Sequence, residues 1–396
     1  MAKIDDSVKK KVPELRFKGF TDDWEERKFK DILKTHSFRS YLAGVSENGE
    51  YEVIQQGDKP IVGYSDGKPF TDYKDVTLFG DHTVSLYKPK SPFFVATDGV
   101  KILSADNFEG NYLYTTLERY KPEPQGYKRH FTILKNQDVW FTENMEEQQK
   151  IGSFFKQLDD TIALHQRKLD LLKEQKKGYL QKMFPKNGAK VPELRFAGFA
   201  DDWEERKLGD EVKINGRIGF RGYTQADIVT KETGVLAYSP TNIVNNRLYR
   251  KQSDTYITKQ KYRESPEIMV KNSDILFVKT GSTLGKSALV QGINYHATVN
   301  PQIVIIRSNE LDEYFLSVIL TSYNILKRIN TIKIGGAIPT MTETELKKFS
   351  IQVPKSTEQK KIGSFFKQLD ETIDLHQRKL DLLKEQKKGY LQKMFV

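Results

Sequence analysis

Residues 150–184 read KIGSFFKQLDDTIALHQRKLDLLKEQKKGYLQKMF, and residues 361–395 repeat them with 33 of 35 positions identical. The stretch has no internal proline and is rich in Leu, Lys, Gln and Glu, so it is predicted to form a long helix. Its apolar residues recur at alternating steps of four and three, which is the 3.5-residue period of a coiled coil. Each copy ends its own half of the chain, so we expect the two helices to pair antiparallel.

The apolar seam of the predicted coiled coil is the same in both copies. Its main members are Ile151, Phe155, Leu158, Ile162, Leu169 and Leu172, with Ile362, Phe366, Leu369, Ile373, Leu380 and Leu383 as counterparts. Polar residues occupy two further seam positions in each copy, His165 and Lys176 with His376 and Lys387. They are expected either to set the register of the pair or to reach solvent from a frayed or widened seam.

A second leucine stripe lies off the seam, at Leu164 and Leu171 in the first copy and at Leu375 and Leu382 in the second. It would either pack against a flanking domain or dock helices of another protein. Because the stripe is duplicated, the second alternative favours a partner that is itself present in two copies.

A second repeated segment begins each half of the chain. VPELRFKGFTDDWEERK at 12–28 recurs at 191–207 with 15 of 17 positions identical, whereas 29–146 and 208–357 show no visible identity. The chain is therefore two like frames around two unlike inserts, which suits a pseudo-two-fold scaffold that reads two targets. The predicted parts are a first recognition domain (1–146), a first spacer helix (147–184), a second recognition domain (185–357) and a second spacer helix (358–396).

The helix length suggests what the scaffold measures. A 35-residue helix is about 52 Å long, and one turn of B-DNA is about 34 Å. Two readers at opposite ends of an antiparallel pair would suit two half-sites separated by a fixed gap.

The amino-acid composition excludes several classes of protein and of functional site. The 396 residues carry 64 Lys and Arg against 53 Asp and Glu, a net charge of +11, and 37% of them are hydrophobic. The chain has no Cys, which excludes disulfides, thiolate metal sites and cysteine nucleophiles, and its six His residues are scattered. No apolar run reaches the roughly 18 residues of a membrane span. We expect a cytoplasmic protein with no membrane partner, and the positive surplus permits nucleic-acid binding.

The second insert carries most of that surplus. Residues 209–350 hold 19 basic and 13 acidic residues, a net charge of +6, and basic residues alternate with tyrosines in RLYRKQSDTYITKQKYR at 247–263. This pattern indicates a phosphate-contacting surface, although short strands with solvated faces would look similar.

Two glycine loops stand out in the same insert. DILFVKTGSTLGKSALV at 274–290 predicts a strand, a glycine turn and a strand; it is one residue short of a P-loop and no helix pattern follows, so a nucleotide site is not expected. KIGGAIPTMT at 333–342 is the second loop.

The first insert, 29–146, has 14 basic and 17 acidic residues, a net charge of −3, so it would have to bind DNA through local clusters. Its short strand-like segments between Gly and Pro turns predict a sheet-rich α/β unit. The candidate DNA contacts of this insert are Lys88, Lys90, Arg119, Lys128 and Arg129. Those of the second insert are Tyr238, Thr241, Asn242, Arg247, Arg250, Lys279, Thr280, Ser282, Thr283, Lys286 and Lys333.

Catalytic motifs are missing from both inserts. Neither contains a glycine-rich S-adenosylmethionine motif, a methyltransferase box or a Walker pair, and Asn300-Pro301-Gln302-Ile303 does not fit the methyltransferase pattern. The chain is predicted to be a non-catalytic binder with no catalytic, cofactor or metal residues of its own.

The layout of insert, helix, insert and helix resembles the DNA specificity subunit of type I restriction-modification systems. The matching residues are Glu147-Gln148 and Glu358-Gln359 leading into the helices, the 274–286 hairpin DILFVKTGSTLGK, and GGAIPTMTETELKKFSIQVPKSTEQ at 335–359. The first junction, VWFTENMEEQ at 139–148, lacks the proline found at Pro354, and the first insert has no GG-x-x-P loop.

The resemblance implies a mixed α/β (α+β) protein with two globular target recognition domains joined by two long antiparallel coiled-coil helices. Each domain would read one half of a bipartite, asymmetric double-stranded DNA site. The helices would bind two DNA methyltransferase subunits, and restriction endonuclease/translocase subunits would join them. S-adenosylmethionine, ATP and Mg would then belong to those partners. The alternative is a coiled-coil adaptor whose inserts bind proteins rather than DNA.

Overall fold

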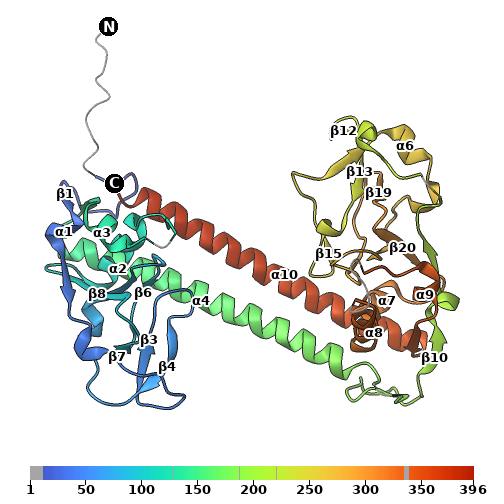
Figure 1. Cartoon of the computed structure of the whole chain (residues 1–396), viewed down its shortest axis with the longest axis horizontal. Helices are drawn as coiled ribbons and strands as arrows, with labels where there is room; N and C mark the ends of the chain where they lie inside the picture. The colour runs from blue at the N-terminus through green and yellow to red at the C-terminus, as the bar shows by residue number, and fades with distance from the viewer. Residues whose placement is uncertain (1–11, 127, 187, 220, 334–338) are drawn as a thin grey trace, which may run out of the picture. The chain divides into compact units, whose positions relative to one another are not determined.

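The computed structural model describes residues 12–396 except 127, 187, 220 and 334–338. The chain divides into two units, one of Met1–Lys168 with His376–Val396 and one of Leu169–Leu375. Both units include part of each long helix, α4 (Met145–Lys182) and α10 (Ser356–Lys393), the green and red helices of Figure 1. Each helix begins two residues before the start expected from the sequence.

The first unit is built around a four-stranded sheet in the order β2-β8-β5-β6 and a three-stranded sheet in the order β4-β3-β7. The strands are β1 (Glu25–Lys28), β2 (Leu33–His36), β3 (Tyr51–Ile54), β4 (Ile61–Ser65), β5 (Thr77–Gly80), β6 (Leu86–Tyr87), β7 (Phe93–Val95), β8 (Val100–Ala105) and β9 (Asp138–Phe141). The shorter helices are α1 (Phe29–Ile32), α2 (Gly110–Tyr120) and α3 (His130–Lys135).

The second unit contains sheets in the orders β11-β20-β17-β18 and β12-β16-β13-β19. Its strands are β10 (Glu204–Lys207), β11 (Val212–Asn215), β12 (Ile228–Val229), β13 (Val235–Tyr238), β14 (Ile243–Val244), β15 (Arg247–Leu248), β16 (Thr255–Ile257), β17 (Ile275–Val278), β18 (Ser287–Leu289), β19 (Ala297–Val299), β20 (Ile303–Ser308) and β21 (Ser350–Val353). Its shorter helices are α5 (Leu208–Glu211), α6 (Lys259–Arg263), α7 (Glu313–Ile319), α8 (Tyr323–Lys333) and α9 (Glu343–Lys347).

The main sheets of the two inserts share one topology although the insert sequences show no visible identity. Strands β2, β8, β5 and β6 correspond in order to β11, β20, β17 and β18. In the second sheet, β3 pairs parallel with β7 as β13 does with β19. The fold class expected from the sequence, a mixed α/β protein with an internal repeat, is confirmed.

The repeated Glu-Gln pairs fasten the helix starts to the recognition domains. Glu147, buried, accepts two hydrogen bonds from Arg16 at 2.6 and 2.8 Å, and Gln148 accepts from Glu109 N and donates to Thr142 O, both at 2.8 Å. Buried polar groups require such partners.

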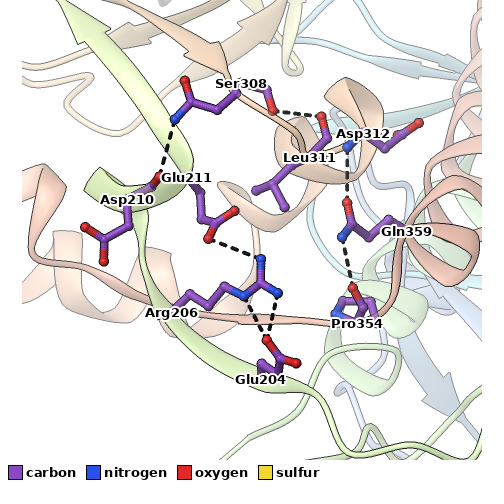
Figure 2. A network of polar contacts seen from close by, with 10 residues as sticks. Glu204, Arg206, Asp210, Glu211, Ser308, Leu311, Asp312, Pro354 and Gln359 are labelled. Carbon is purple, nitrogen blue, oxygen red and sulfur yellow. Dashed lines mark hydrogen bonds and ion pairs between the residues drawn. The ribbon is translucent and has the colours of Figure 1, made fainter.

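The second unit repeats this arrangement. Arg195 donates to Glu358 at 2.7 and 2.8 Å. Gln359 accepts from Asp312 N at 3.1 Å and donates to Pro354 O at 2.9 Å, as Figure 2 shows. Thr142 O thus accepts in the first unit the bond that Pro354 O accepts in the second.

Each unit's core is completed by the helix end that comes from the other half of the sequence. Met394 and Phe395, at the end of α10, belong to the core of the first unit, where Phe395 packs edge-on against Trp24 with ring centroids 5.7 Å apart. Met183 and Phe184, at the end of α4, take the same place in the second unit beside Trp203.

The long helices pair antiparallel in both units, as expected. In the first unit Phe154 lies edge-on to Tyr390, with ring centroids 5.1 Å apart, and His165 faces His376 at 5.8 Å. In the second unit Tyr179 lies edge-on to Phe365 at 5.0 Å. The predicted seam is buried at Ile151, Phe155, Leu169, Leu172, Ile362, Phe366, Leu380 and Leu383 and half-buried at Leu158, Ile162, Leu369 and Ile373.

The two seam lysines form corresponding ion pairs with the opposite helix. Lys176 pairs with Asp370 at 2.6 Å in the second unit, and its counterpart Lys387 pairs with Asp159 at 2.6 Å in the first. These lysine side chains are 18% and 12% exposed, so the structure favours a role in setting the register over one of reaching solvent.

The second leucine stripe is exposed. Leu164, Leu171, Leu375 and Leu382 are 61%, 52%, 63% and 52% exposed. The interpretation in which the stripe packs against a flanking domain is therefore wrong. Across the described part of the chain, no helix is long and apolar enough to cross a membrane.

Candidate nucleic-acid interface

One end of the main sheet in the second unit gathers the loops that the sequence singled out. Strands β11 and β17 both pair antiparallel with β20. The C-terminal ends of β11 and β17 therefore lie beside the start of β20 at Ile303. The loops that follow Asn215 and Val278, and the loop that precedes Ile303, emerge at this same end.

The two predicted glycine loops contact each other at this end. Gly281 N donates to Pro339 O at 2.8 Å, and Met341 N donates to Lys279 O at 2.9 Å. Gly281 and Gly285 have φ angles of +98° and +89°, which favour glycine. A Cβ at Gly285 would also come within 2.9 Å of Ile329, so the hairpin lies tightly against α8.

This loop pair presents polar groups to solvent. Ser282 and Lys286 are exposed, and Thr280 and Thr283 are partly exposed. Lys279 is held by an ion pair with Glu343 at 3.3 Å. Lys333 is the last residue of α8, and its side chain lies outside the described residues.

Two of the predicted DNA contacts, Tyr238 and Asn242, are buried within the domain. Tyr238 is 1% exposed, and its hydroxyl lies 2.7 Å from that of Tyr295; burial raises its pKa well above the usual range. Asn242 is 2% exposed and donates to Tyr249 O at 2.9 Å. Their burial removes both from the candidate surface, whereas Thr241, between them, is exposed.

The two candidate arginines of the 247–263 segment, Arg247 and Arg250, differ in their surroundings. Arg247 forms an ion pair with Asp374 of α10. Arg250 donates to the Tyr256 hydroxyl at 2.8 Å, which raises the pKa of Arg250, and its guanidinium lies 4.9 Å from the centre of the Tyr295 ring. Arg250 also lines an open cleft of about 640 Å³ together with Lys231 and Lys251. Such a cleft offers three cations to a phosphate.

Sequence reasoning missed two arginines in the loop that follows β11. Arg217 is partly buried, donates to Arg221 O at 2.8 Å and to Val299 O at 2.9 Å, and burial lowers its pKa. Arg221 is exposed. The alternation of glycine and arginine in GRIGFRGY at 216–223 was the available signal.

The first unit has an equivalent end. Strands β2 and β5 both pair antiparallel with β8, so the loops that follow His36 and Gly80 emerge together. His130 N donates to Asp81 O at 2.8 Å, which ties the segment before α3 to the loop after β5. The exposed Lys128 and Arg129 lie in that segment, next to the equivalent end.

The remaining predicted contacts of the first insert are not gathered there. Lys88 and Lys90 follow Tyr87 at the end of β6, which pairs with Leu78, so they lie toward the opposite end of the sheet from Gly80. The ammonium of Lys88 donates to Val76 O at 2.9 Å, and burial lowers its pKa to about 8. Arg119 is partly buried beside the Tyr120 ring, 5.1 Å from its centre. Lys90 is exposed and lines a cleft of about 840 Å³ beside α4.

The arrangement offers hydrogen-bond donors and cations to a polyanion. Among the residues that the structure describes, no group of three or more His, Asp or Glu side chains is placed to hold a metal ion.

A family model, the type I restriction modification DNA specificity domain, matches residues 21–174 and 200–385. The type I restriction enzyme MjaVIII specificity subunit of Methanocaldococcus jannaschii is 22% identical over 252 residues, which are 62% of this chain and 58% of that protein. The putative MjaX specificity subunit of the same organism is 22% identical over 62% of this chain and 55% of its own length. The chain thus matches somewhat over half the length of these curated relatives.

Two solved structures share the fold. The S subunit of a type I restriction-modification system from M. genitalium superposes with a TM-score of 0.68 at 15% identity, covering 97% of this chain and 99% of that one. A chain from a study of complex assembly and conformational transition of the type I R-M system gives a TM-score of 0.51 at 12% identity, covering 94% of this chain and 97% of that one.

Proposed function

The chain belongs to the type I restriction-modification DNA specificity family, and from this premise we propose that it is the subunit that reads a bipartite, asymmetric double-stranded DNA site. Residues 1–146 and 185–357 act as the two recognition domains, one for each half-site. The chain itself is non-catalytic, and the chemistry belongs to its partners in the cytoplasm.

The observation that carries this proposal is the pairing of one topology with two unlike sets of loops. The main sheets correspond strand for strand, yet the loops at the equivalent ends differ in sequence and charge. A shared scaffold with different loop side chains is suited to reading two different base sequences by the same docking geometry.

The candidate contacts divide by chemistry. Arg221, Arg250, Lys286, Lys128 and Arg129 are exposed cations suited to phosphates, which give affinity and make it depend on salt. Thr241, Thr280, Ser282 and Thr283 are short hydroxyl side chains, of which Thr241 and Ser282 are exposed and the others partly exposed, suited to base edges or phosphates.

The doubled, exposed leucine stripe supports docking of two methyltransferase subunits. Leu164 with Leu382 lie in the first unit, and Leu171 with Leu375 lie in the second. Exposed leucines at helical spacing are typical of a surface that receives a partner's helix. In this proposal, methyltransferase subunits supply the S-adenosylmethionine chemistry, and restriction subunits supply the ATP- and Mg-dependent steps.

Methylome sequencing tests the proposal. Cells that express the chain with its cognate methyltransferase should show methylation at a two-part motif with a fixed gap. Replacing residues 208–357 with another family member's insert should change one half of the motif and leave the other half unchanged. An unchanged motif after this replacement contradicts the proposal.

A salt series separates this function from that of a protein-binding adaptor. The logarithm of DNA affinity should fall steeply with the logarithm of salt concentration when phosphates are contacted. A flat response in the assembled complex would favour the adaptor.

A further inference from the structure

The 35-residue repeats at 150–184 and 361–395, which form most of the two long helices, differ at two positions: Asp160 corresponds to Glu371, and Ala163 corresponds to Asp374. The first difference exchanges one carboxylate for another. The second places a charge in one helix where the other has a methyl group. Asp374 is the residue whose carboxylate forms the ion pair with Arg247.

Arg247 begins β15 of a small hairpin in the second recognition domain. The turn between β14 and β15 is made by Asn245 and Asn246, with φ angles of +51° and +61°, the left-handed pair of a tight two-residue turn. On its inner side, Ile243 is 1% exposed and Leu248 packs against the domain core. The base of the hairpin is closed by Tyr249 N donating to Asn242 O at 2.9 Å.

On its other side the hairpin is held by the helix. The side chains of Arg247 and Asp374 are 30% and 25% exposed, so the pair is partly shielded from solvent. Directly after the hairpin come Tyr249, 44% exposed, and Arg250, which lines the basic cleft. The position of the hairpin therefore sets where these two side chains are presented.

The first helix has no carboxylate at the position of Asp374, where Ala163 stands instead. Ala163 lines the open cleft of about 840 Å³ together with Tyr87, Lys90 and Tyr114. At this position the first helix therefore borders an open cleft, whereas the second helix carries the carboxylate that pairs with Arg247.

We infer that Asp374 is a positioning residue for recognition of the second half-site: through Arg247 it fixes the β14–β15 hairpin on α10 and so orients the surface formed by Tyr249 and Arg250. Arg247 is then an anchor of the domain and not a DNA contact. This inference rests on the proposed function, because it assigns the hairpin to the DNA-reading surface.

The substitution Asp374→Ala tests the anchoring role of Asp374. Glu371→Asp is the matched control, because each substitution introduces into α10 the residue found at the corresponding position of α4. Hydrogen exchange of the purified chain needs no DNA. Asp374→Ala should raise exchange at the amides of 243–248 by about fivefold, as loss of a partly exposed ion pair does. Glu371→Asp should leave exchange unchanged. Unchanged exchange in Asp374→Ala overturns the anchor, whatever the chain binds.

Arg247→Ala and the reversed pair Arg247→Asp with Asp374→Arg separate an anchor from a DNA contact. With the cognate methyltransferase, Asp374→Ala and Arg247→Ala should both lower discrimination at the second half-site, leave the first half-site unaffected, and be rescued by the reversed pair. If Arg247 instead contacts phosphate, Arg247→Ala lowers the salt slope by about one, the reversed pair fails, and the inference is overturned. A wild-type complex without a two-part motif would count against the proposed function alone.

Discussion

Glu147 and Glu358 are carboxylates with almost no exposure to solvent, and each is held by one arginine from the repeat that precedes its domain. A buried charge that loses its partner is strongly destabilising. The identical residues in the two repeats therefore have a structural explanation, because they form the same buried junction twice.

Arg16→Ala should lower the free energy of unfolding by about 3–5 kcal/mol, since it leaves Glu147 buried without a partner. Adding Glu147→Gln should recover part of the loss. The exposed pair of Lys34 and Asp106 is the control, and Lys34→Ala should cost less than about 1 kcal/mol. Denaturant unfolding measures all of these variants. Equal losses of unfolding free energy in Arg16→Ala and Lys34→Ala would contradict the importance of the buried junction.

Gly152 illustrates a residue fixed by close packing. A Cβ there would lie 2.3 Å from a carboxylate oxygen of Glu109 and 2.7 Å from Tyr112 N, whereas a Cβ at Gly178 of the same helix meets nothing within 4 Å. Gly152→Ala should destabilise the chain by about 1–3 kcal/mol. Gly178→Ala should stabilise it by up to about 1 kcal/mol. Thermal unfolding of both variants checks the opposite signs.

Lys88 predicts a pH dependence. Burial lowers its pKa from 10.5 to about 8, so the unfolded chain binds this proton more tightly than the folded chain does. Between about pH 8 and pH 10.5, the free energy of unfolding of the wild type should therefore rise relative to that of Lys88→Met. Parallel curves for the two proteins over this range would contradict the assignment.

At the scale of elements, the two leucine stripes of the helices should behave differently. Leu169 is 1% exposed in the seam, and Leu164 is 61% exposed. Leu169→Ala should lower the free energy of unfolding by about 2–5 kcal/mol, and Leu164→Ala by less than about 0.5 kcal/mol.

The proposed docking role predicts that the exposed leucines, which contribute little to stability, are required for binding of the methyltransferase. Changing Leu164, Leu171, Leu375 and Leu382 to Gln should leave the melting temperature near that of the wild type and abolish co-purification of the methyltransferase. Retained co-purification would place the docking surface elsewhere.

Some elements of the fold could be predicted from the sequence and others could not. The helices were predictable because a 3.5-residue period repeats over many turns, and their antiparallel pairing because each copy ends its own half of a repeated chain. The common topology of the inserts was not, since sheet order depends on contacts between distant short strands. For the same reason, Lys88 could not be recognised as partly buried, nor the loop of Arg217 as lying at the same end of the sheet as the glycine loop that follows β17.

At the scale of the whole molecule, the length of the helix pair is proposed to set the gap between the two half-sites. Inserting one heptad into both α4 and α10 keeps the apolar seam in phase and adds about 10 Å to each helix. The methylated motif should then acquire a longer gap and keep both half-site sequences. A changed half-site sequence would contradict this model.

The completion of the first core by Met394 and Phe395 has a consequence for synthesis. Trp24 is synthesised more than 370 residues before its ring partner Phe395. The second unit, which spans Leu169–Leu375, has all its residues earlier. The portion made first should therefore reach its native state last, and a released chain truncated after residue 393 should have a protease-resistant second unit and a protease-sensitive first unit.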